Sequence, residues 1–426
     1  MDDYMPQDQQ FLWCVTDPDL PRLVGRLRLV RRAGSHPGGV SLEYEPEWLA
    51  SGFSLSEDMP LQRGEFFPQV QDDAAGAVND ARPDRWGERV IRHLDRPARL
   101  STIEFLYFAG DERFGALGVS LEASAYIPRP RGALARISDV SAIHELVRRV
   151  ESGQPVEERM RRLLAPGTLG GARPKAIVEI DDLQWVVKFA DKGDDMDSPL
   201  AEHAAMTLAA AAGIDVCRTF PIPLAAGPSG KSPGHAVAVL RFDRGQRRRV
   251  HALTADVALR AAGLENGYPE LALLLRRRGD SDLISANGEE IFRRMVFNIL
   301  IDNTDDHEKN HAVLAGDNEL YRLAPAYDVL PTAQSLGYQS IKVGLYGSDP
   351  TIENALSEHR SFMLTLDQAR AICREVATVV ERWAVHFSAA GVVGQDLDLL
   401  SSHIDREALR RERRVALDGA AFTHRG

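Results

Sequence analysis

Hydrophobic and polar residues alternate over short stretches in the first part of the chain. LVGRLRLV (residues 23–30) alternates and then meets the break GSHPGG (34–39), which is typical of a strand that enters a turn. A helical pattern follows around RPDRWGERVIRHL (82–94), and TIEFLYFAGDERFGALGVSLE (102–122) combines a helix-like start, a turn and a short strand. Residues 1–125 are therefore predicted to form a β-rich subdomain with added helices.

The pattern changes after residue 125. A Pro- and Arg-containing connection leads to a helix with apolar positions at Ile143, Leu146 and Val147, predicted to run to about Leu164. A glycine-rich loop, GTLGGARPK (167–175), then precedes two strands that flank an Asp-Asp turn.

A helix is predicted next, with Ser198 as its N-cap, Pro199 as its first residue and Gly213 just past its end. The apolar strand HAVAVLRFDRG (235–245) ends abruptly in charged residues.

The remainder of the chain is mainly helical in pattern up to about Leu300. A short strand pair in HAVLAGDNELYRLAP (311–325) and further helices such as LDQARAICREVATVVERWAVHF (366–387) complete it. We therefore predict an α+β protein with an N-terminal subdomain (1–125), a small β-rich lobe (126–243) and a larger helical lobe (244–426).

Composition narrows the class of protein. Hydrophobic residues make up 44% and charged residues 27%, which is ordinary for a globular protein. The net charge of −11 disfavours direct binding to nucleic acid through a broad positive field. Three widely spaced cysteines without a CxxC pair favour a reducing compartment, and neither a membrane-spanning run nor a signal-peptide pattern is found. We expect a cytoplasmic protein.

The stretch DNTDDHEKNHAVL (302–314) crowds acidic side chains directly after the apolar run IFRRMVFNILI. Such crowding is costly unless a cation or water offsets the charge. Asp305 and Asn310 are five residues apart, and Asp328 follows beyond the predicted strand pair. Phosphoryl transfer needs this set: one carboxylate to accept a proton from the attacking hydroxyl, and an amide and a second carboxylate to hold Mg²⁺.

Other interpretations of this stretch remain open on its residues alone. It could be an acidic loop that caps a helix end, and a two-metal hydrolase site could use Asp305, Asp306 and His307. An EF-hand is disfavoured because the aspartates are misspaced and the loop glycine is absent.

Upstream features favour the kinase interpretation. Lys188 interrupts the apolar run WVVKF, where burial would require an anionic partner, although its stem could also reach water. Glu202 on the next helix could pair with Lys188, or could simply be an acid favoured by the helix dipole. Glycine loop, lysine strand, acidic helix, apolar strand and Asp-x4-Asn loop occur in the order of a kinase, which predicts a bilobal protein-kinase-like fold.

These residues resemble one family, the HipA serine/threonine kinases of bacterial toxin–antitoxin systems. NTDDHEKNHAVL and LAPAYDVLPT resemble its catalytic and metal-binding segments, GGARPKA its nucleotide loop and VLRFDR its hinge strand. RPDRWGERVI and FLYFAGDERFGAL resemble parts of its N-terminal subdomain.

The resemblance implies a role for each matching position. Asp305 would be the catalytic proton acceptor, Asn310 and Asp328 would hold Mg²⁺, and Lys188 would contact the phosphates of ATP. Thr168 matches a serine that is autophosphorylated in the family. Glu202 would be the acidic partner of Lys188. The remaining nucleotide-binding positions would be Gly170, Gly171, Ala172, Arg173, Pro174, Lys175, Leu240, Arg241, Phe242, His307, Glu308, Lys309 and Tyr327.

The resemblance also implies partners and a function. A helix-turn-helix antitoxin of the HipB type would supply the contact to DNA, a homodimer is possible, and the chain would phosphorylate a cellular protein, such as a tRNA synthetase, to arrest growth. Two alternatives stay open: a weakly active or inactive kinase fold that acts as an antitoxin-bound co-repressor, and a kinase for a small metabolite.

Overall fold

The computed structural model describes residues 4–31, 37–164, 171–225, 234–316 and 319–418. The chain forms two units, each of which combines segments that are far apart in the sequence. The first unit consists of Met1–Phe189, Leu240–Ala262 and Leu314–Glu319, and the second consists of Ala190–Val239, Gly263–Val313 and Leu320–Gly426. The division into three consecutive domains stays a prediction.

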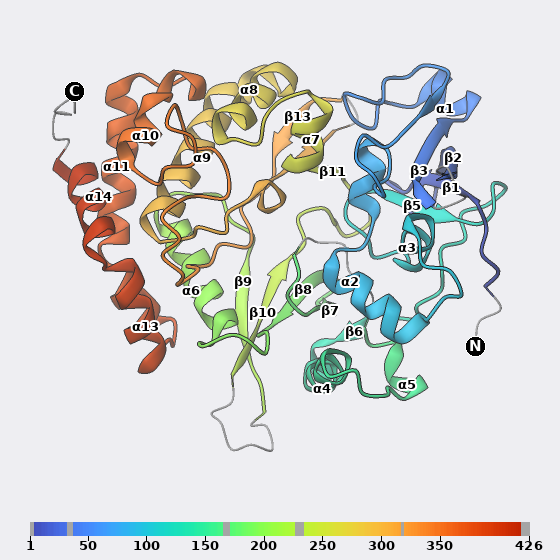
Figure 1. The fold of residues 1–426 in the computed structure, drawn as a ribbon, viewed down its shortest axis with the longest axis horizontal. Coiled ribbons are helices and arrows are strands. Elements are labelled where there is room, and N and C mark those ends of the chain that lie inside the picture. The colour runs from blue at the N-terminus through green and yellow to red at the C-terminus, as the bar shows by residue number, and fades with distance from the viewer. Residues whose placement is uncertain (1–3, 32–36, 165–170, 226–233, 317–318, 419–426) are drawn as a thin grey trace. The chain divides into compact units, whose positions relative to one another are not determined.

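The first unit contains a five-stranded antiparallel sheet with the order β4-β3-β2-β1-β5 (Figure 1). Its strands are β1 (Gln9–Cys14), β2 (Arg22–Arg31), β3 (Pro37–Tyr44), β4 (Glu65–Phe66) and β5 (Leu117–Ser120). Along β2, Leu27 and Leu29 are buried whereas Arg26 and Arg28 are partly exposed. The alternation in the sequence thus correctly predicted a half-buried strand.

Short helices complete this part of the first unit. They are α1 (Pro46–Ser51), α2 (Arg85–Val90), α3 (Thr102–Phe108), α4 (Val140–Glu151), α5 (Glu158–Arg161) and α7 (Ala255–Ala261), with the short strands β6 (Ala135–Arg136) and β11 (His251–Thr254). The prediction that α4 runs to Leu164 was wrong. Gly153 adopts a left-handed φ of 69° two residues past the end of the helix, and Pro155 cannot continue it.

A β-hairpin forms where the sequence predicted two strands around an Asp-Asp turn. β7 (Lys175–Ile180) pairs antiparallel with β8 (Leu183–Phe189), and β6 pairs parallel with β7. Asp181 and Asp182 have φ values of 51° and 59°, which suits a two-residue turn whose twist matches that of the strands.

The second unit begins with the helix α6 (Ser198–Ala211), followed by the antiparallel strands β9 (Thr219–Pro223) and β10 (His235–Leu240). Gly213 lies just past α6 with a φ of 84°, as predicted. The predicted N-cap was wrong by one residue, because the Asp197 carboxylate accepts the hydrogen bond from the Leu200 backbone N–H and Ser198 is already helical.

Helices dominate the rest of the second unit (Figure 1). They are α8 (Tyr268–Arg278), α9 (Ile284–Leu300), α10 (Ile352–Ser357), α11 (Leu366–Val380), α12 (Trp383–Ala389), α13 (Gln395–Ile404) and α14 (Glu407–Asp418). Helix α9 packs against α8 and α11, and α14 packs against α11. The strands β12 (Ala312–Ala315) and β13 (Tyr321–Leu323) follow α9, where a strand pair was predicted. Buried Phe292, Met295 and Phe297 make α9 the centre of this core.

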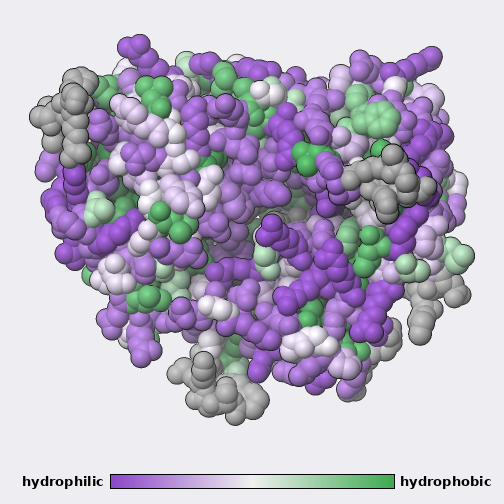
Figure 2. Space-filling view, viewed as in Figure 1, coloured by the Kyte–Doolittle hydropathy of each residue, from purple (hydrophilic) through white to green (hydrophobic). Residues whose placement is uncertain are grey.

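Exposed residues are mainly hydrophilic, and hydrophobic residues form small separate patches on the face drawn in Figure 2. All three cysteines lie in the described part of the chain, are buried, and form no disulfide. Among the helices of the described residues, none is long and apolar enough to cross a membrane.

Candidate functional site

The predicted catalytic segment begins directly after the core helix α9 in the second unit. The chain leaves α9 through Asp302, whose φ of 62° turns the backbone sharply. The Asp302 carboxylate is buried and accepts a hydrogen bond of 2.5 Å from the Arg406 guanidinium. Aspartate tolerates the left-handed region better than most residues, so that this turn is fixed by its residue type and by its ion pair.

The two adjacent aspartates Asp305 and Asp306 lie in opposite environments. Asp305 is exposed, whereas Asp306 is 2% exposed. One oxygen of Asp306, Oδ2, accepts hydrogen bonds from Asn298 Nδ2 at 2.9 Å, from the Tyr268 hydroxyl, and from His311 Nε2 at 3.0 Å. Asp306 therefore connects Tyr268 on α8 and Asn298 on α9 with His311, which lies at the other end of the predicted catalytic segment.

Electrostatics keeps Asp306 ionised in this buried place. Burial alone would raise the pKa of Asp306, but the charge and hydrogen bond of His311 and the Tyr268 hydroxyl together lower that pKa below its ordinary value. The pKa of the Tyr268 hydroxyl is raised well above its ordinary value by burial and by the Asp306 charge. The Tyr268 hydroxyl thus stays a donor to the carboxylate.

The segment that carries Asn310 is folded back on Asp305. Asn310 lies in a 3-10 turn (Glu308–Asn310), is 7% exposed, and donates from Nδ2 to the backbone oxygen of Asp305 at 3.3 Å. His307 begins this turn by accepting a hydrogen bond of 3.2 Å from the Lys309 backbone N–H at Nδ1. Asp305 and Asn310, five residues apart in the sequence, are therefore in direct contact.

A second contact links this segment to the one that carries Asp328. The Tyr327 hydroxyl donates to the backbone oxygen of Lys309 at 2.8 Å. Asp328 itself has a φ of 59°, in the left-handed region that aspartate tolerates better than most residues. The predicted catalytic and metal-binding segments are thus brought together in the second unit.

The predicted nucleotide-binding residues of the first unit lie on and beside the hairpin β7–β8. Lys188 on β8 is directly opposite Lys175 on β7, so that both side chains leave the same face of the hairpin. Both are buried, at 8% and 2% exposed. Two buried ammonium groups on one face require anionic groups nearby.

Lys175 is held by a partner that the sequence alone did not indicate. Its Nζ lies 2.8 Å from Asp84 Oδ2, and the Asp84 Oδ1 accepts from the Gly87 backbone N–H as the N-cap of α2. Burial raises the pKa of Asp84 despite the charge of Lys175. The Lys175 backbone oxygen also accepts from Trp86 Nε1 at 2.8 Å. Lys175 therefore joins the hairpin to α2.

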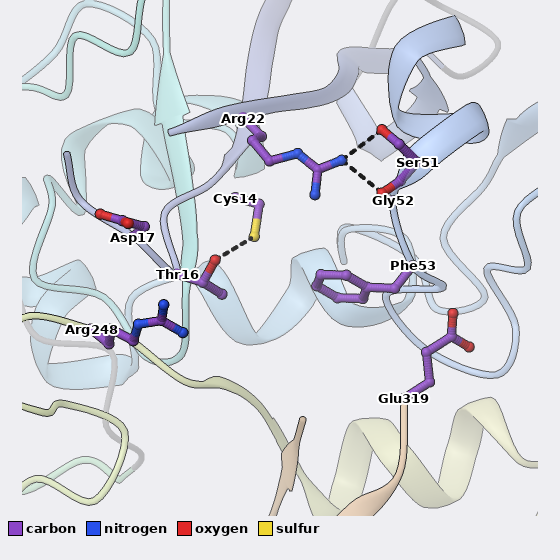
Figure 3. A pocket seen from close by; sticks show the side chains of 9 residues that line it. All are labelled: Cys14, Thr16, Asp17, Arg22, Ser51, Gly52, Phe53, Arg248 and Glu319. Atoms are coloured by element: carbon purple, nitrogen blue, oxygen red, sulfur yellow. Dashed lines mark hydrogen bonds between the residues drawn. The ribbon is translucent and has the colours of Figure 1, made fainter. Parts of the chain in front are cut away.

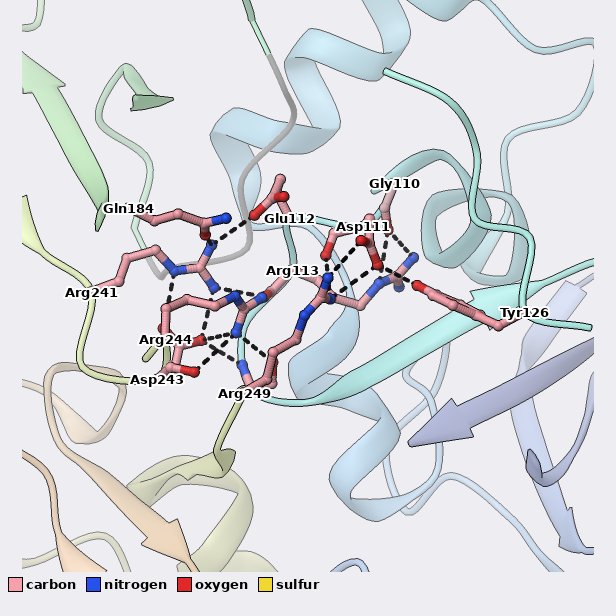
Figure 4. Close-up of polar contacts among 11 residues, drawn as sticks. Gly110, Asp111, Glu112, Arg113, Tyr126, Gln184, Arg241, Asp243, Arg244 and Arg249 are labelled. Carbon is pink, nitrogen blue, oxygen red and sulfur yellow. Dashed lines mark hydrogen bonds and ion pairs between the residues drawn. The ribbon is translucent and has the colours of Figure 1, made fainter. Parts of the chain in front are cut away.

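The segment Leu240–Phe242, predicted to bind the nucleotide, takes part through Arg241 in a buried ionic network within the first unit (Figure 4). Asp243 is completely buried and accepts from Arg241 at 2.8 Å, from Arg244 at 2.9 Å and from the Gly115 backbone N–H at 2.8 Å. The rings of Phe242 and Phe114 meet edge to face. Residues 110–115 of the N-terminal region therefore fix the conformation of this segment.

Arg241 uses its donors inside the protein. Its guanidinium reaches Asp243, Gln184 Oε1 at 3.1 Å and the Arg113 backbone oxygen at 2.8 Å. Burial would raise the pKa of Asp243, but Arg241 and Arg244 lower it to about 2. Burial and the nearby charge of Arg241 lower the pKa of Arg244 to about 9.

The other predicted residues have the following outcome. Thr168 and Gly170 lie outside the described residues. Gly171 has a φ of 91°, and its backbone oxygen accepts from Lys175 Nζ at 3.4 Å. Lys188 belongs to the first unit and buried Glu202 to the second, so that their pairing stays a prediction.

The structure adds residues that the sequence did not single out for a role in a kinase. Asp306 was considered only as a ligand of a two-metal hydrolase, and Asp84, Asp243 and Tyr268 were not considered. All three hydrogen bonds that Asp306 accepts end on its Oδ2, so that this oxygen is occupied by partners within the protein. In the described part of the chain, no three His, Cys, Asp or Glu side chains form a group that could hold a metal ion. The arrangement thus gives no support to the two-metal interpretation built on Asp305, Asp306 and His307.

A separate cavity of about 330 Å³ lies in the first unit (Figure 3). It is lined by Cys14, Thr16, Asp17, Arg22, Ser51, Gly52, Phe53, Arg248 and Glu319. Arg22 donates to the backbone oxygen and the hydroxyl of Ser51, at 2.8 and 2.9 Å. The predicted site residues are not among its lining residues.

Comparison with known proteins places these features in one family. The model of the HipA-like C-terminal domain matches residues 167–383, about half of the chain, and that of the HipA N-terminal domain matches residues 22–120. A relative from Sinorhizobium fredii that is named as a kinase, Y4dM, is 27% identical over 246 residues, which cover 54% of this chain and 58% of that protein. A relative from Haemophilus influenzae, also named as a kinase, is 29% identical over 138 residues, which cover 30% of this chain and 39% of that protein.

The chain thus spans about half the length of these curated relatives. Its fold is similar to that of a chain in the solved complex of HipA, HipB and operator DNA from Shewanella oneidensis, with a TM-score of 0.65 and 17% identity, covering 96% of this chain and 100% of that chain. Because the matches to the N-terminal and C-terminal domains follow one another along the sequence, this chain belongs to the HipA family and has its kinase-like α+β fold.

Proposed function

We propose that the chain is an ATP- and Mg²⁺-dependent serine/threonine protein kinase that arrests growth by phosphorylating a cellular protein. One observation carries this proposal. An exposed carboxylate, Asp305, stands at the head of a segment whose Asn310 folds back onto it, and Tyr327 links this segment to Asp328. Phosphoryl transfer requires positioned groups of these types.

Each residue would have a distinct role. Asp305 orients the acceptor hydroxyl and takes up its proton, while Asn310 and Asp328 offer the hard oxygen ligands that Mg²⁺ prefers. Bound Mg²⁺ would neutralise charge on the phosphates. Lys188 would bind phosphate oxygens, and the backbone of Leu240 and Phe242 would contact adenine. The nucleotide site would be completed by Gly170–Lys175, His307–Lys309 and Tyr327.

Regulation and partners follow the family. The Shewanella HipA was solved together with HipB and operator DNA, and we propose a comparable helix-turn-helix antitoxin as the partner of this chain, with DNA contacted through it. The net charge of −11 suits such indirect binding. We further propose that the chain autophosphorylates Thr168 and that its target is a tRNA synthetase. The protein would form a homodimer and be located in the cytoplasm.

The test is a phosphate-transfer assay. The purified chain is incubated with labelled Mg–ATP and cell lysate, and mass spectrometry scores Thr168 and new phosphoproteins. Asp305→Asn should abolish transfer, whereas Asp367→Asn, an exposed aspartate in the first turn of α11, should leave it unchanged. Transfer that persists in Asp305→Asn would contradict the role of Asp305.

The same assay separates the two alternatives. Label that enters only small molecules identifies a metabolite kinase. Nucleotide binding without transfer, together with antitoxin-dependent operator shifts, identifies a co-repressor.

A further inference from the structure

The segment 333–348 of the second unit combines low charge with outward-facing apolar side chains. It lies between β13 and α10, and its sequence AQSLGYQSIKVGLYGS contains one charged residue, Lys342. Four large apolar residues in it are exposed: Leu336 at 41%, Tyr338 at 53%, Leu345 at 67% and Tyr346 at 59%. Single exposed apolar residues are normal, but four within eleven positions require an explanation.

The segment is anchored beside the proposed catalytic residue. The Ser340 backbone N–H and hydroxyl both donate to the backbone oxygen of Thr304, at 3.2 and 2.9 Å. Thr304 directly precedes Asp305 in the chain. Ile341 and Val343 are buried, so that alternate side chains of this stretch point inward and the others outward.

The exposed tip is also held firmly. The buried amide of Asn354 on α10 accepts from the Tyr346 backbone N–H at 2.8 Å and donates to the Gly347 backbone oxygen at 3.0 Å. The Leu345 backbone N–H donates to the Ser357 hydroxyl at 3.0 Å. The exposure of Leu345 and Tyr346 is therefore enforced by the backbone, and a ligand would meet a surface that is already ordered.

The two halves of the surface lie side by side. The Gln339 backbone N–H donates to the Ser348 backbone oxygen at 2.8 Å, which places Tyr338 next to the turn that carries Leu345 and Tyr346. The single charge of the segment is compensated, because Lys342 Nζ lies 2.5 Å from Glu270. The large exposed side chains of the segment are aromatic and aliphatic, with two tyrosine hydroxyls, and its other exposed residues, such as Gln334, Ser335 and Ser340, are polar but uncharged.

We infer that Leu336, Tyr338, Leu345 and Tyr346 form a docking surface for an uncharged, apolar stretch of the polypeptide acceptor that flanks the phosphorylated hydroxyl. This inference rests on the proposed function and names the substrate class at the same site. Tyrosine-rich, ordered and uncharged surfaces are typical of the centre of protein interfaces, whereas small molecules bind in concave pockets. The anchor on Thr304 places this surface where chain flanking an acceptor at Asp305 would pass.

The test uses a synthetic library of peptides with a central serine or threonine and randomised flanking positions. The unchanged chain should select apolar or aromatic residues at one or more flanking positions. With the best library peptide, Tyr338→Ser/Tyr346→Ser should raise KM for the peptide about tenfold, a typical effect of lost apolar contacts in a specificity site. KM for ATP should not change, because neither tyrosine belongs to the proposed nucleotide site.

A matched control replaces two exposed valines elsewhere on the same unit. Val385→Ser/Val393→Ser changes side chains that are 75% and 67% exposed and should leave both KM values unchanged. If the tyrosine variant keeps the peptide preference and KM of the unchanged chain, the docking surface is refuted while the proposed kinase stands. A tyrosine variant that only loses self-association in sedimentation would assign the surface to a second copy and refute it as well. Failure of the unchanged chain to phosphorylate any peptide or lysate protein would overturn the proposed function and the inference with it.

Discussion

The imidazole Nε2 of His311 lies 3.0 Å from the carboxylate of Asp306, five residues earlier in the chain, and both side chains are buried. This contact joins the two ends of the predicted catalytic segment, because Asp305 directly precedes Asp306 and Asn310 directly precedes His311. The segment is therefore held at both ends by groups that do not themselves face the proposed substrate. Asp305 and Asp306, although adjacent, should respond very differently to the same substitution.

Asp306→Asn should lower the free energy of unfolding by about 2–4 kcal/mol, because an amide in place of the carboxylate leaves buried donors poorly paired. Asp305→Asn should abolish phosphate transfer while changing stability by less than about 0.5 kcal/mol, as expected for an exposed side chain. Urea unfolding and the transfer assay measure the two effects. Equal stability losses in the two variants would contradict the division of roles.

Asp243 should make the protein sensitive to acid. Its pKa of about 2 in the folded state is below the ordinary value of 3.8, so that its contribution to stability is present above pH 4 and is lost as the pH falls toward 2. The contribution should be about 2 kcal/mol. Unfolding free energies of the unchanged chain and of Asp243→Asn, measured between pH 7 and 2, should converge at the acidic end. A constant difference across this range would contradict the assignment.

The buried pair of Lys175 and Asp84 should act as a unit. Lys175→Met alone should cost about 3–5 kcal/mol, since it leaves the Asp84 carboxyl without its ion-pair partner. Lys175→Met combined with Asp84→Asn should recover a large part of this loss. A double-mutant cycle in urea unfolding measures the coupling. Strictly additive effects would show that the pair is not coupled.

Lys188 lies directly opposite Lys175 on the same face of the hairpin, and its substitution can be compared with that of Lys175. Lys188→Met should weaken binding of ATP and abolish transfer, as expected for a group that binds phosphate. Titration with a fluorescent ATP analogue measures the binding. Full ATP affinity in this variant would remove Lys188 from the nucleotide site.

Removal of divalent cations should stop phosphate transfer. Chelation with EDTA should abolish the activity of the unchanged chain, and added Mg²⁺ should restore it. Asp328→Asn should require at least tenfold more Mg²⁺ for half-maximal activity, which corresponds to the loss of one charged oxygen ligand. Activity that is indifferent to EDTA would contradict the proposed metal dependence.

Local patterns in the sequence were sufficient for several features. The alternation in LVGRLRLV predicted β2, the Asp181–Asp182 turn predicted the hairpin β7–β8, and Gly213 marked the end of α6. Each of these depends on interactions between residues close in sequence, for which residue type largely decides the backbone conformation. Residue types and their order along the chain also pointed to the HipA family.

Other features depended on contacts that no local pattern encodes. Ser198 and Asp197 are both good N-caps, and only the position of the helix in the fold selected Asp197. Asp305 and Asp306 are the same residue type in neighbouring positions. Burial against Tyr268 and Asn298, 38 and 8 residues before Asp306, made one structural and left the other exposed.

The sequence by itself determined which chemical groups are available: an Asp-x4-Asn segment, a later aspartate, and a lysine within an apolar strand. Only the tertiary structure decided which charged groups of the chain are paired with partners inside the protein. Asp84 binds Lys175 across 91 positions of the chain, and Gly115 binds Asp243 across 128. The physical reason is that the free energy of a charged group depends on its burial and on its partners, and partners so distant in sequence are fixed only when the whole chain is folded.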